Sequence, residues 1–145
     1  MIKDLAAIVA CILTAYFVAI AATVEGLLLY GAPIILLCAV VSFVVHWIIA
    51  VPSVLTSSEK YFDLTGMIAT LLVVFTAMFA LLNSGQQGSI RSTIVAIFVS
   101  IWTLRLGTFL YKRIVKSGED TRFREIKKSL PKFLMAWTLS ALWVF

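Results

Sequence analysis

The sequence predicts an all-α protein, a polytopic transmembrane helical bundle with about five membrane spans and one short interfacial amphipathic helix. Three observations predict this class. Hydrophobic residues make up 62% of the 145 residues and charged residues only 13%, against about 25% charged residues in a soluble domain. The apolar residues form long runs between short polar stretches, and the basic residues concentrate in one segment beside those runs. We therefore expect a single membrane-embedded domain over residues 1–145, because so few charges cannot cover a water-facing surface.

The first two predicted spans form an antiparallel hairpin. Residues 5–24 are an uninterrupted apolar run, and 20 helical residues cover the hydrocarbon core of about 30 Å. This run is longer than the apolar core of a signal peptide, so we interpret it as a retained span. Glu25 follows it, where an interfacial position is expected. The second span, residues 33–51, begins at Pro33, which suits a first helical turn, and is predicted to stop at Pro52.

The third and fourth spans are predicted over residues 64–82 and 89–111. Asp63 precedes the third span and is expected to cap it by accepting a backbone N–H bond. A turn-rich stretch, residues 83–88, joins the two spans. Gly118 is placed to end the fourth helix in a left-handed cap.

A basic loop is predicted over residues 112–130, since the stretch 112–132 holds eight of the twelve Lys and Arg residues. Phe123, Ile126 and Leu130 share one helical face in it, and basic side chains occupy the others. This pattern is typical of an amphipathic helix lying among anionic headgroups, here near residues 121–130. The partners we expect are thus membrane lipids, and no aromatic-interleaved groove for nucleic acid is present.

The fifth span, residues 131–145, is short. Its 15 residues reach about 22 Å, less than the hydrocarbon core of about 30 Å, and no polar flank follows Phe145. We expect that the chain is incomplete at its C-terminus. The alternative is that a partner or a thinned bilayer shelters this end. Five spans place ten basic residues on one side and Arg91 on the other, which predicts a cytoplasmic N-terminus.

Few polar residues lie within the spans. His46 is the single histidine, which excludes a paired-histidine metal site and leaves an interhelical hydrogen bond or a proton-handling role. Cys11 and Cys38 are expected to be packing residues. Arg105 either extends its guanidinium toward the interface or faces the bundle and binds an anion. None of the common hydrolase, nucleotide-binding or redox motifs occurs, so no catalytic residue is assigned.

Four stretches in succession carry a resemblance: SEKYFDLTG (58–66), RLGTFLYKR (105–113), GEDTRF (118–123) and WTLSALWVF (137–145). From His46 onward the chain resembles an uncharacterised bacterial membrane family allied to the steroid 5-alpha-reductases and sterol reductases. The resemblance implies a multi-helix enzyme of the bacterial inner membrane that uses NADPH to reduce a carbon–carbon double bond in a lipid-like enone.

The resemblance also implies candidate cofactor-binding residues. Matching the family pattern selects Arg105, Arg113, Glu119, Asp120 and Arg122, with Asp63 as a further polar residue of interest. The competing interpretation of residues 118–123 is a helix-capping turn at the interface. The family's cofactor site, with its His-Pro-Asn-Tyr segment, lies in a C-terminal half that this chain lacks, so the resemblance covers the N-terminal half only.

Two functions follow as hypotheses. In the first, the chain is the membrane portion of a steroid 5-alpha-reductase-like NADPH-dependent lipid reductase, inactive alone and completed by the C-terminal half or another membrane subunit. In the second, it is a non-enzymatic small membrane protein that acts as a binding or assembly partner. A transporter would need more intramembrane charge than Arg105 and His46 provide.

Overall fold

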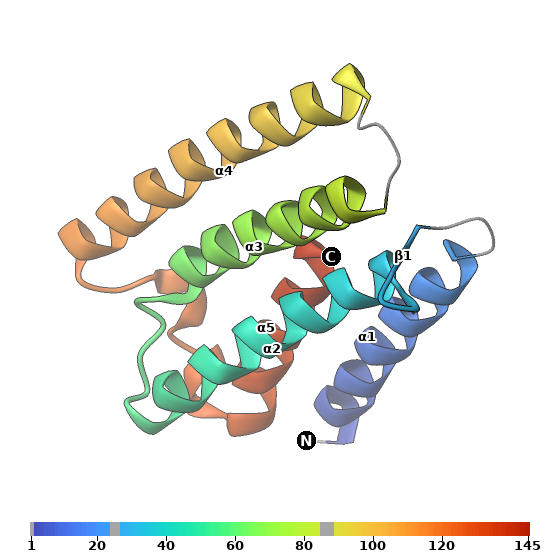
Figure 1. The fold of residues 1–145 in the computed structure, drawn as a ribbon. Helices are drawn as coiled ribbons and strands as arrows, with labels where there is room; N and C mark the ends of the chain where they lie inside the picture. The colour runs from blue at the N-terminus through green and yellow to red at the C-terminus, as the bar shows by residue number, and fades with distance from the viewer. Residues whose placement is uncertain (1, 24–26, 85–88) are drawn as a thin grey trace.

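The computed structural model describes residues 2–23, 27–84 and 89–145. Glu25 and most of the predicted turn at 83–88 lie outside them, so the expectations for both are not examined by the structure. The described chain forms five α-helices, α1 (Ile2–Ala21), α2 (Ile34–Leu55), α3 (Phe62–Asn83), α4 (Ile90–Ser117) and α5 (Leu130–Val144). Two single-turn 3-10 helices, η1 (Thr121–Phe123) and η2 (Ile126–Lys128), precede α5 (Figure 1).

The predicted class is confirmed. Among the described helices, α1 to α4 are each long and apolar enough to cross a membrane, and α5 is a shorter apolar helix. Their exposed surfaces carry many large apolar side chains, such as Phe17, Phe75 and Phe98, which only a lipid environment solvates without cost. The chain is a multi-pass integral membrane protein.

One predicted helix end was wrong. Helix α2 does not stop at Pro52 but continues to Leu55, because a proline in the last turn removes one N–H bond while its fixed φ still suits a helix. The Pro52 carbonyl accepts bonds from the Thr56 N–H at 3.0 Å and the Thr56 hydroxyl at 2.9 Å, which closes that turn. Helix α4 extends to Ser117 and ends as predicted at Gly118, whose φ of 80° is left-handed.

A short hairpin between α1 and α2 was not predicted. Strand β1 (Leu28–Leu29) pairs antiparallel with β2 (Ala32–Pro33). The turn residues Tyr30 and Gly31 both have positive φ, 51° and 82°, as a type I′ turn requires. Pro33 therefore ends a strand directly before α2 rather than lying in its first turn.

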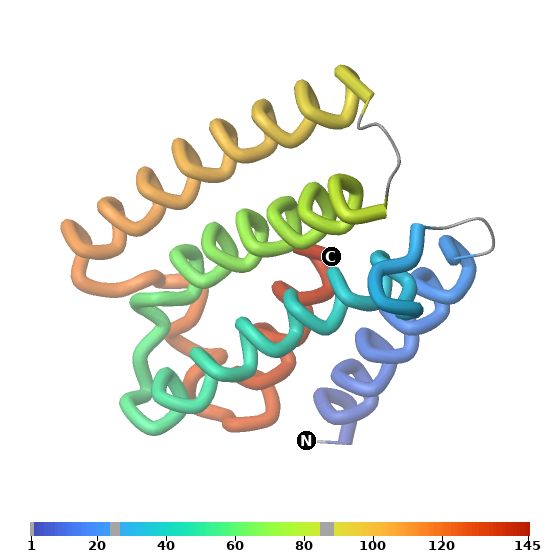
Figure 2. The backbone as a smooth tube through the Cα atoms, in the orientation of Figure 1, coloured from blue at the N-terminus to red at the C-terminus, as the bar shows by residue number. Residues whose placement is uncertain are grey.

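Helix α3 lies between α4 on one side and the pair α2 and α5 on the other, and α1 packs against α5 and α2 (Figures 1 and 2). Helix α4 packs mainly against α3, so most of its surface faces outward. The most buried large side chains belong to α5, where Trp137 and Phe133 are 0% and 2% exposed. The shortest helix thus forms the centre of the bundle.

The segment 121–130 is not the amphipathic α-helix that we expected. It forms the two 3-10 turns, and Phe123 is buried against Phe62, Phe133 and the Trp137 cluster, with a ring-centroid distance of 4.6 Å to Phe62. Phe123 and Ile126 of the predicted apolar face therefore pack on the protein core at one end of the bundle, whereas Leu130 is 55% exposed.

Candidate functional site

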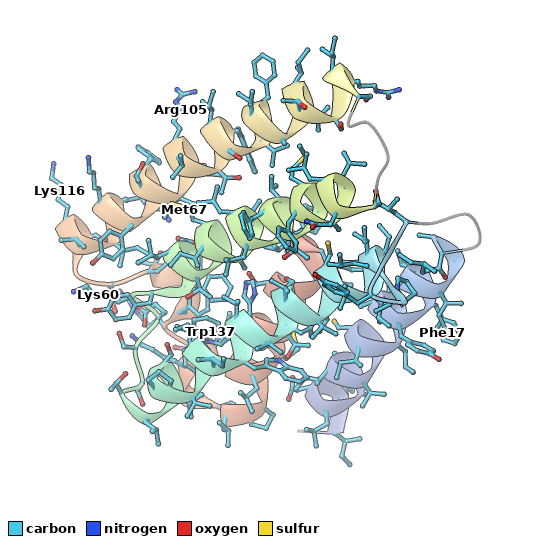
Figure 3. The ribbon with its side chains drawn as sticks, in the orientation of Figure 1. Phe17, Lys60, Met67, Arg105, Lys116 and Trp137 are labelled. Atoms are coloured by element: carbon cyan, nitrogen blue, oxygen red, sulfur yellow. The ribbon has the colours of Figure 1, made fainter. Side chains whose placement is uncertain are left out.

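A group of charged side chains gathers where the α2–α3 connection, the end of α4 and the two 3-10 turns meet. We call it the loop cluster and define it by six residues: Glu59, Asp63, Arg113, Asp120, Arg122 and Lys127. Its members come from segments about sixty positions apart in the sequence, which lie side by side at one end of the bundle (Figure 2). Lys60 and Lys116 lie at the same end (Figure 3).

Glu59 ties the α2–α3 connection to the basic loop. Its side chain is 4% exposed; one carboxylate oxygen accepts the Asp120 N–H at 3.0 Å and the other accepts Lys127 Nζ at 2.9 Å. Burial raises the pKa of Glu59, but these two hydrogen bonds outweigh it and hold the pKa below its usual range. Glu59 is therefore ionised at neutral pH and satisfied by two partners.

Asp120 is the second buried carboxylate of the loop cluster. Arg122 Nε donates to its two oxygens at 3.0 and 2.8 Å, Arg122 Nη2 also contacts it, and Arg113 Nη2 lies 3.7 Å away. The side-chain hydrogen bond from Arg122 lowers the pKa of Asp120 below its usual range. Asp120 also accepts the backbone N–H of Arg122 at 2.9 Å and so caps η1.

Asp63 does not cap α3, contrary to expectation. The residue at the cap position is Tyr61, which makes no side-chain cap bond. Asp63 instead accepts a hydrogen bond from Arg122 Nη2 at 3.2 Å. A carboxylate in the first turn still interacts favourably with the positive end of the helix, and here it also links α3 to η1.

The structure brings together three of the five predicted cofactor residues, Arg113, Asp120 and Arg122. Glu119 is separate from them, since it pairs with Arg124 at the surface. Arg105 lies on the exposed face of α4 and points away from α3 (Figure 3). Of the two interpretations left open for Arg105, the bundle-facing one is wrong. The capping interpretation of residues 118–123 is confirmed by Gly118 and Asp120.

A groove of about 440 Å³ opens beside the loop cluster between α3, α4 and α5. Asp63 and Arg122 lie at one end of it. The other lining residues are Phe62, Gly66, Met67 and Thr70 of α3, Trp102, Thr103, Leu106, Gly107 and Leu110 of α4, and Ser140, Trp143 and Val144 of α5. Since most of these side chains are apolar, the groove has a charged mouth and a largely hydrophobic wall.

Three hydroxyl groups, those of Thr70, Thr103 and Ser140, interrupt that hydrophobic wall. Thr103 is 4% exposed and its hydroxyl has no hydrogen-bond partner among the described residues. Ser140 Oγ lies 3.1 Å from His46 Nε2, while His46 Nδ1 lies 2.8 Å from the Ser42 carbonyl oxygen. His46 is fully buried and bridges α2 and α5, so the hydrogen-bonded interhelical interpretation of this residue is confirmed.

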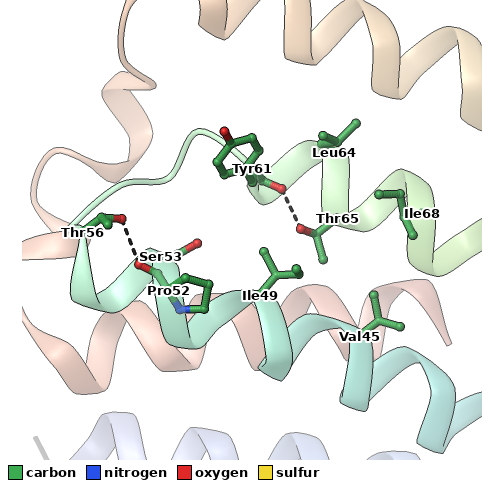
Figure 4. A pocket seen from close by; sticks show the side chains of 9 residues that line it. All are labelled: Val45, Ile49, Pro52, Ser53, Thr56, Tyr61, Leu64, Thr65 and Ile68. Atoms are coloured by element: carbon green, nitrogen blue, oxygen red, sulfur yellow. Dashed lines mark hydrogen bonds between the residues drawn. The ribbon is translucent and has the colours of Figure 1, made fainter.

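A second groove, of about 430 Å³, lies between α2 and α3 and is lined by residues such as Val45, Ile49 and Ile68 (Figure 4). Its threonine hydroxyls are satisfied within their own helices, as Thr56 donates to the Pro52 carbonyl and Thr65 to the Tyr61 carbonyl. The other residues that line this groove are mainly apolar, with the buried Ser53 among them.

Sequence reasoning missed Glu59, Lys127, Thr103 and Ser140. Glu59 lies within the stretch 58–66 that carries the resemblance, so its position was available as a signal, but its pairing with Asp120 and Lys127 was not. Among the described residues no group of three His, Cys, Asp or Glu side chains could hold a metal ion. Cys11 and Cys38 are free and buried, in agreement with the packing role.

The fold and the site define a multi-pass helical membrane protein with an ionic cluster at one end of an intramembrane groove. A family model described as "Protein of unknown function (DUF1295)" matches residues 46–145. The chain belongs to the DUF1295 family, and the matched region contains α3 to α5, the loop cluster and the groove. No curated protein and no solved structure matches the chain.

Proposed function

We propose that this protein is the membrane portion of an NADPH-dependent lipid reductase of the steroid 5-alpha-reductase kind, and that the α3–α4–α5 groove holds the lipid-like enone. The observation that carries the proposal is the groove itself, with apolar walls, buried hydroxyls and a charged mouth. Its volume of about 440 Å³ falls in the range of small-molecule sites. A lipid substrate can enter it from the bilayer because three membrane helices form its walls.

The loop cluster fits the phosphate groups of a nicotinamide cofactor at the groove's mouth. Arg113 and Arg122 keep 47% and 55% of their side chains exposed, so donors remain for an incoming phosphate. Both arginines already contact Asp120, so a phosphate would share them with that carboxylate. When bound, the cofactor supplies a hydride, and these side chains would hold it beside the lipid.

The proposal includes a second component. The family's His-Pro-Asn-Tyr segment does not occur in the sequence, so we propose that the rest of the cofactor site comes from another segment or subunit. We also propose that the loop cluster faces the cytoplasm, because ten of the twelve basic residues belong to that end. NADPH is available on that side of the membrane.

Filling the groove is expected to abolish binding of an enone lipid. Gly66 lines the groove, and a Cβ added there meets no atom within 4 Å. The substitution Gly66→Leu therefore places a bulky apolar side chain in open space without a clash at its base. In lipid nanodiscs, the wild-type protein should bind a tritiated 3-oxo-4-ene steroid saturably, and Gly66→Leu should weaken this binding at least tenfold.

The matched control is Ala10→Leu, which adds the same side chain on the exposed face of α1 and should leave binding unchanged. Saturable binding that survives Gly66→Leu would place the ligand elsewhere. An absence of saturable binding by the wild-type protein would contradict the reductase proposal and favour a non-enzymatic assembly role.

A further inference from the structure

Helical hydroxyl groups in this protein are commonly satisfied by their own helix. A Ser or Thr side chain can donate to the carbonyl oxygen four residues earlier, which removes the cost of burying a hydroxyl. Seven described residues do so at 2.6–2.9 Å: Thr56, Thr65, Thr70, Thr76, Ser100, Thr108 and Thr138. Ser100 and Thr108 flank Thr103 on α4, so the geometry of α4 permits this bond.

Thr103 departs from that pattern. Thr103 is 4% exposed, yet its hydroxyl has no hydrogen-bond partner among the described residues. It lines the groove one helical turn from Gly107, where an added Cβ would lie 2.5 Å from Met67 Cβ of α3. A buried donor without a partner is destabilising, and a ligand in the groove would relieve that cost.

The hydroxyl of Ser140, which also lines the groove, already donates a hydrogen bond within the protein. A carbonyl oxygen only accepts, so His46 Nδ1 must donate its proton to Ser42, and Nε2 of the neutral ring must then accept. Ser140 consequently donates its proton to His46 Nε2. The Thr70 hydroxyl likewise donates its hydrogen bond to the Gly66 carbonyl oxygen. Of the three hydroxyls that line the groove, only that of Thr103 can therefore still donate a hydrogen bond to a ligand.

We propose that the Thr103 hydroxyl donates a hydrogen bond to the carbonyl oxygen of the lipid bound in the groove. The inference rests on the proposed function and adds to it the group that recognises the polar atom of the substrate. A hydrogen bond there withdraws electron density from the conjugated double bond, which makes its far carbon more electrophilic. Thr103 is thus a substrate-binding residue inside the membrane, distinct from the loop cluster.

The test compares two ligands that differ in one oxygen, a 3-oxo-4-ene steroid and its 3-deoxy analogue, binding to protein in nanodiscs. The wild-type protein should bind the ketone about tenfold more tightly, since a buried donor is left without a partner by the analogue. Thr103→Val keeps the shape and removes the donor, so it should bind the ketone about tenfold more weakly and the deoxy analogue as well as the wild type does.

Two further variants make the result decisive. Thr103→Ser retains the donor and should keep the tenfold preference, whereas Thr103→Ala should lose it, which decides the matter if Thr103→Val fails to fold. Thr108→Val is the control, because Thr108 is exposed and donates to the Leu104 carbonyl; its preference should equal that of the wild type.

The two proposals fail in different ways. Equal binding of both steroids by the wild-type protein, or a preference that survives both Thr103→Val and Thr103→Ala, would overturn the role of Thr103 and leave the groove as a lipid site. If neither steroid binds the wild-type protein, the proposed function itself is wrong.

Discussion

Replacing Glu59 with alanine is expected to lower the free energy of unfolding by about 2–3 kcal/mol. The substitution removes a buried carboxylate that accepts two hydrogen bonds, from the Asp120 N–H and from Lys127 Nζ. Lys127 is only 24% exposed, so its ammonium would remain partly buried without a partner. Unfolding in mixed micelles of SDS and a mild detergent, followed by tryptophan fluorescence, measures the change.

The control for Glu59 is Glu125→Ala. Glu125 pairs with Lys128 in the same basic loop, but both side chains are largely exposed, at 75% and 64%, and such surface pairs contribute little. Glu125→Ala should leave the unfolding transition where it is in the wild-type protein. Equal transitions for the two variants would show that burial of Glu59 does not stabilise the loop cluster.

Replacing Gly107 with alanine is expected to destabilise the protein by about 2 kcal/mol through the contact between α3 and α4. A Cβ at this position would lie 2.5 Å from Met67 Cβ and 2.7 Å from Met67 Cγ and Sδ. The first of these atoms is fixed to the α3 backbone, so rotation of the methionine side chain cannot remove the clash. The helices must separate, and α4 packs on little besides α3.

The pairing of these two residues can be isolated in a double-mutant cycle. Met67→Gly removes all three clashing atoms, so Gly107→Ala should cost much less in that background, whereas Met67→Ala leaves Cβ in place and should rescue little. Gly66→Ala is the control, because its added Cβ meets no atom within 4 Å and alanine favours a helix over glycine. If Gly107→Ala destabilised the wild-type, Met67→Gly and Met67→Ala proteins equally, close packing at this position would be contradicted.

The helices could be predicted from the sequence because hydrophobic run length and turn residues are local signals. The same local rules misplaced the end of α2, since a proline in the last helical turn is tolerated. The segment 121–130 shows a different limit. An apolar stripe formed by Phe123 and Ile126 suits a membrane surface or a protein core equally, and only the contacts with Phe62 and Trp137 decide between them.

The site could be predicted only in part for a related reason. Matching to the family pattern selected Asp63, Asp120 and Arg122 among others. It could not show that Asp63 bonds Arg122, or that Glu59 bonds Asp120, across about sixty residues. No periodicity in one sequence encodes such a pairing. That the Thr103 hydroxyl has no hydrogen-bond partner among the described residues could not be predicted either. In a sequence, a threonine that bonds to its own helix looks the same as one that does not.

The most direct measurement for the lipid site is photoaffinity labelling with a diazirine derivative of the 3-oxo-4-ene steroid, in nanodiscs, followed by mass spectrometry of the labelled peptides. The account predicts labels within residues 66–70 of α3 and 102–107 of α4, which compete with unlabelled steroid and disappear in Gly66→Leu. Labelling of the α2–α3 groove around Ile49 and Ile68 (Figure 4), or labels on exposed helix faces that unlabelled steroid does not displace, would contradict it.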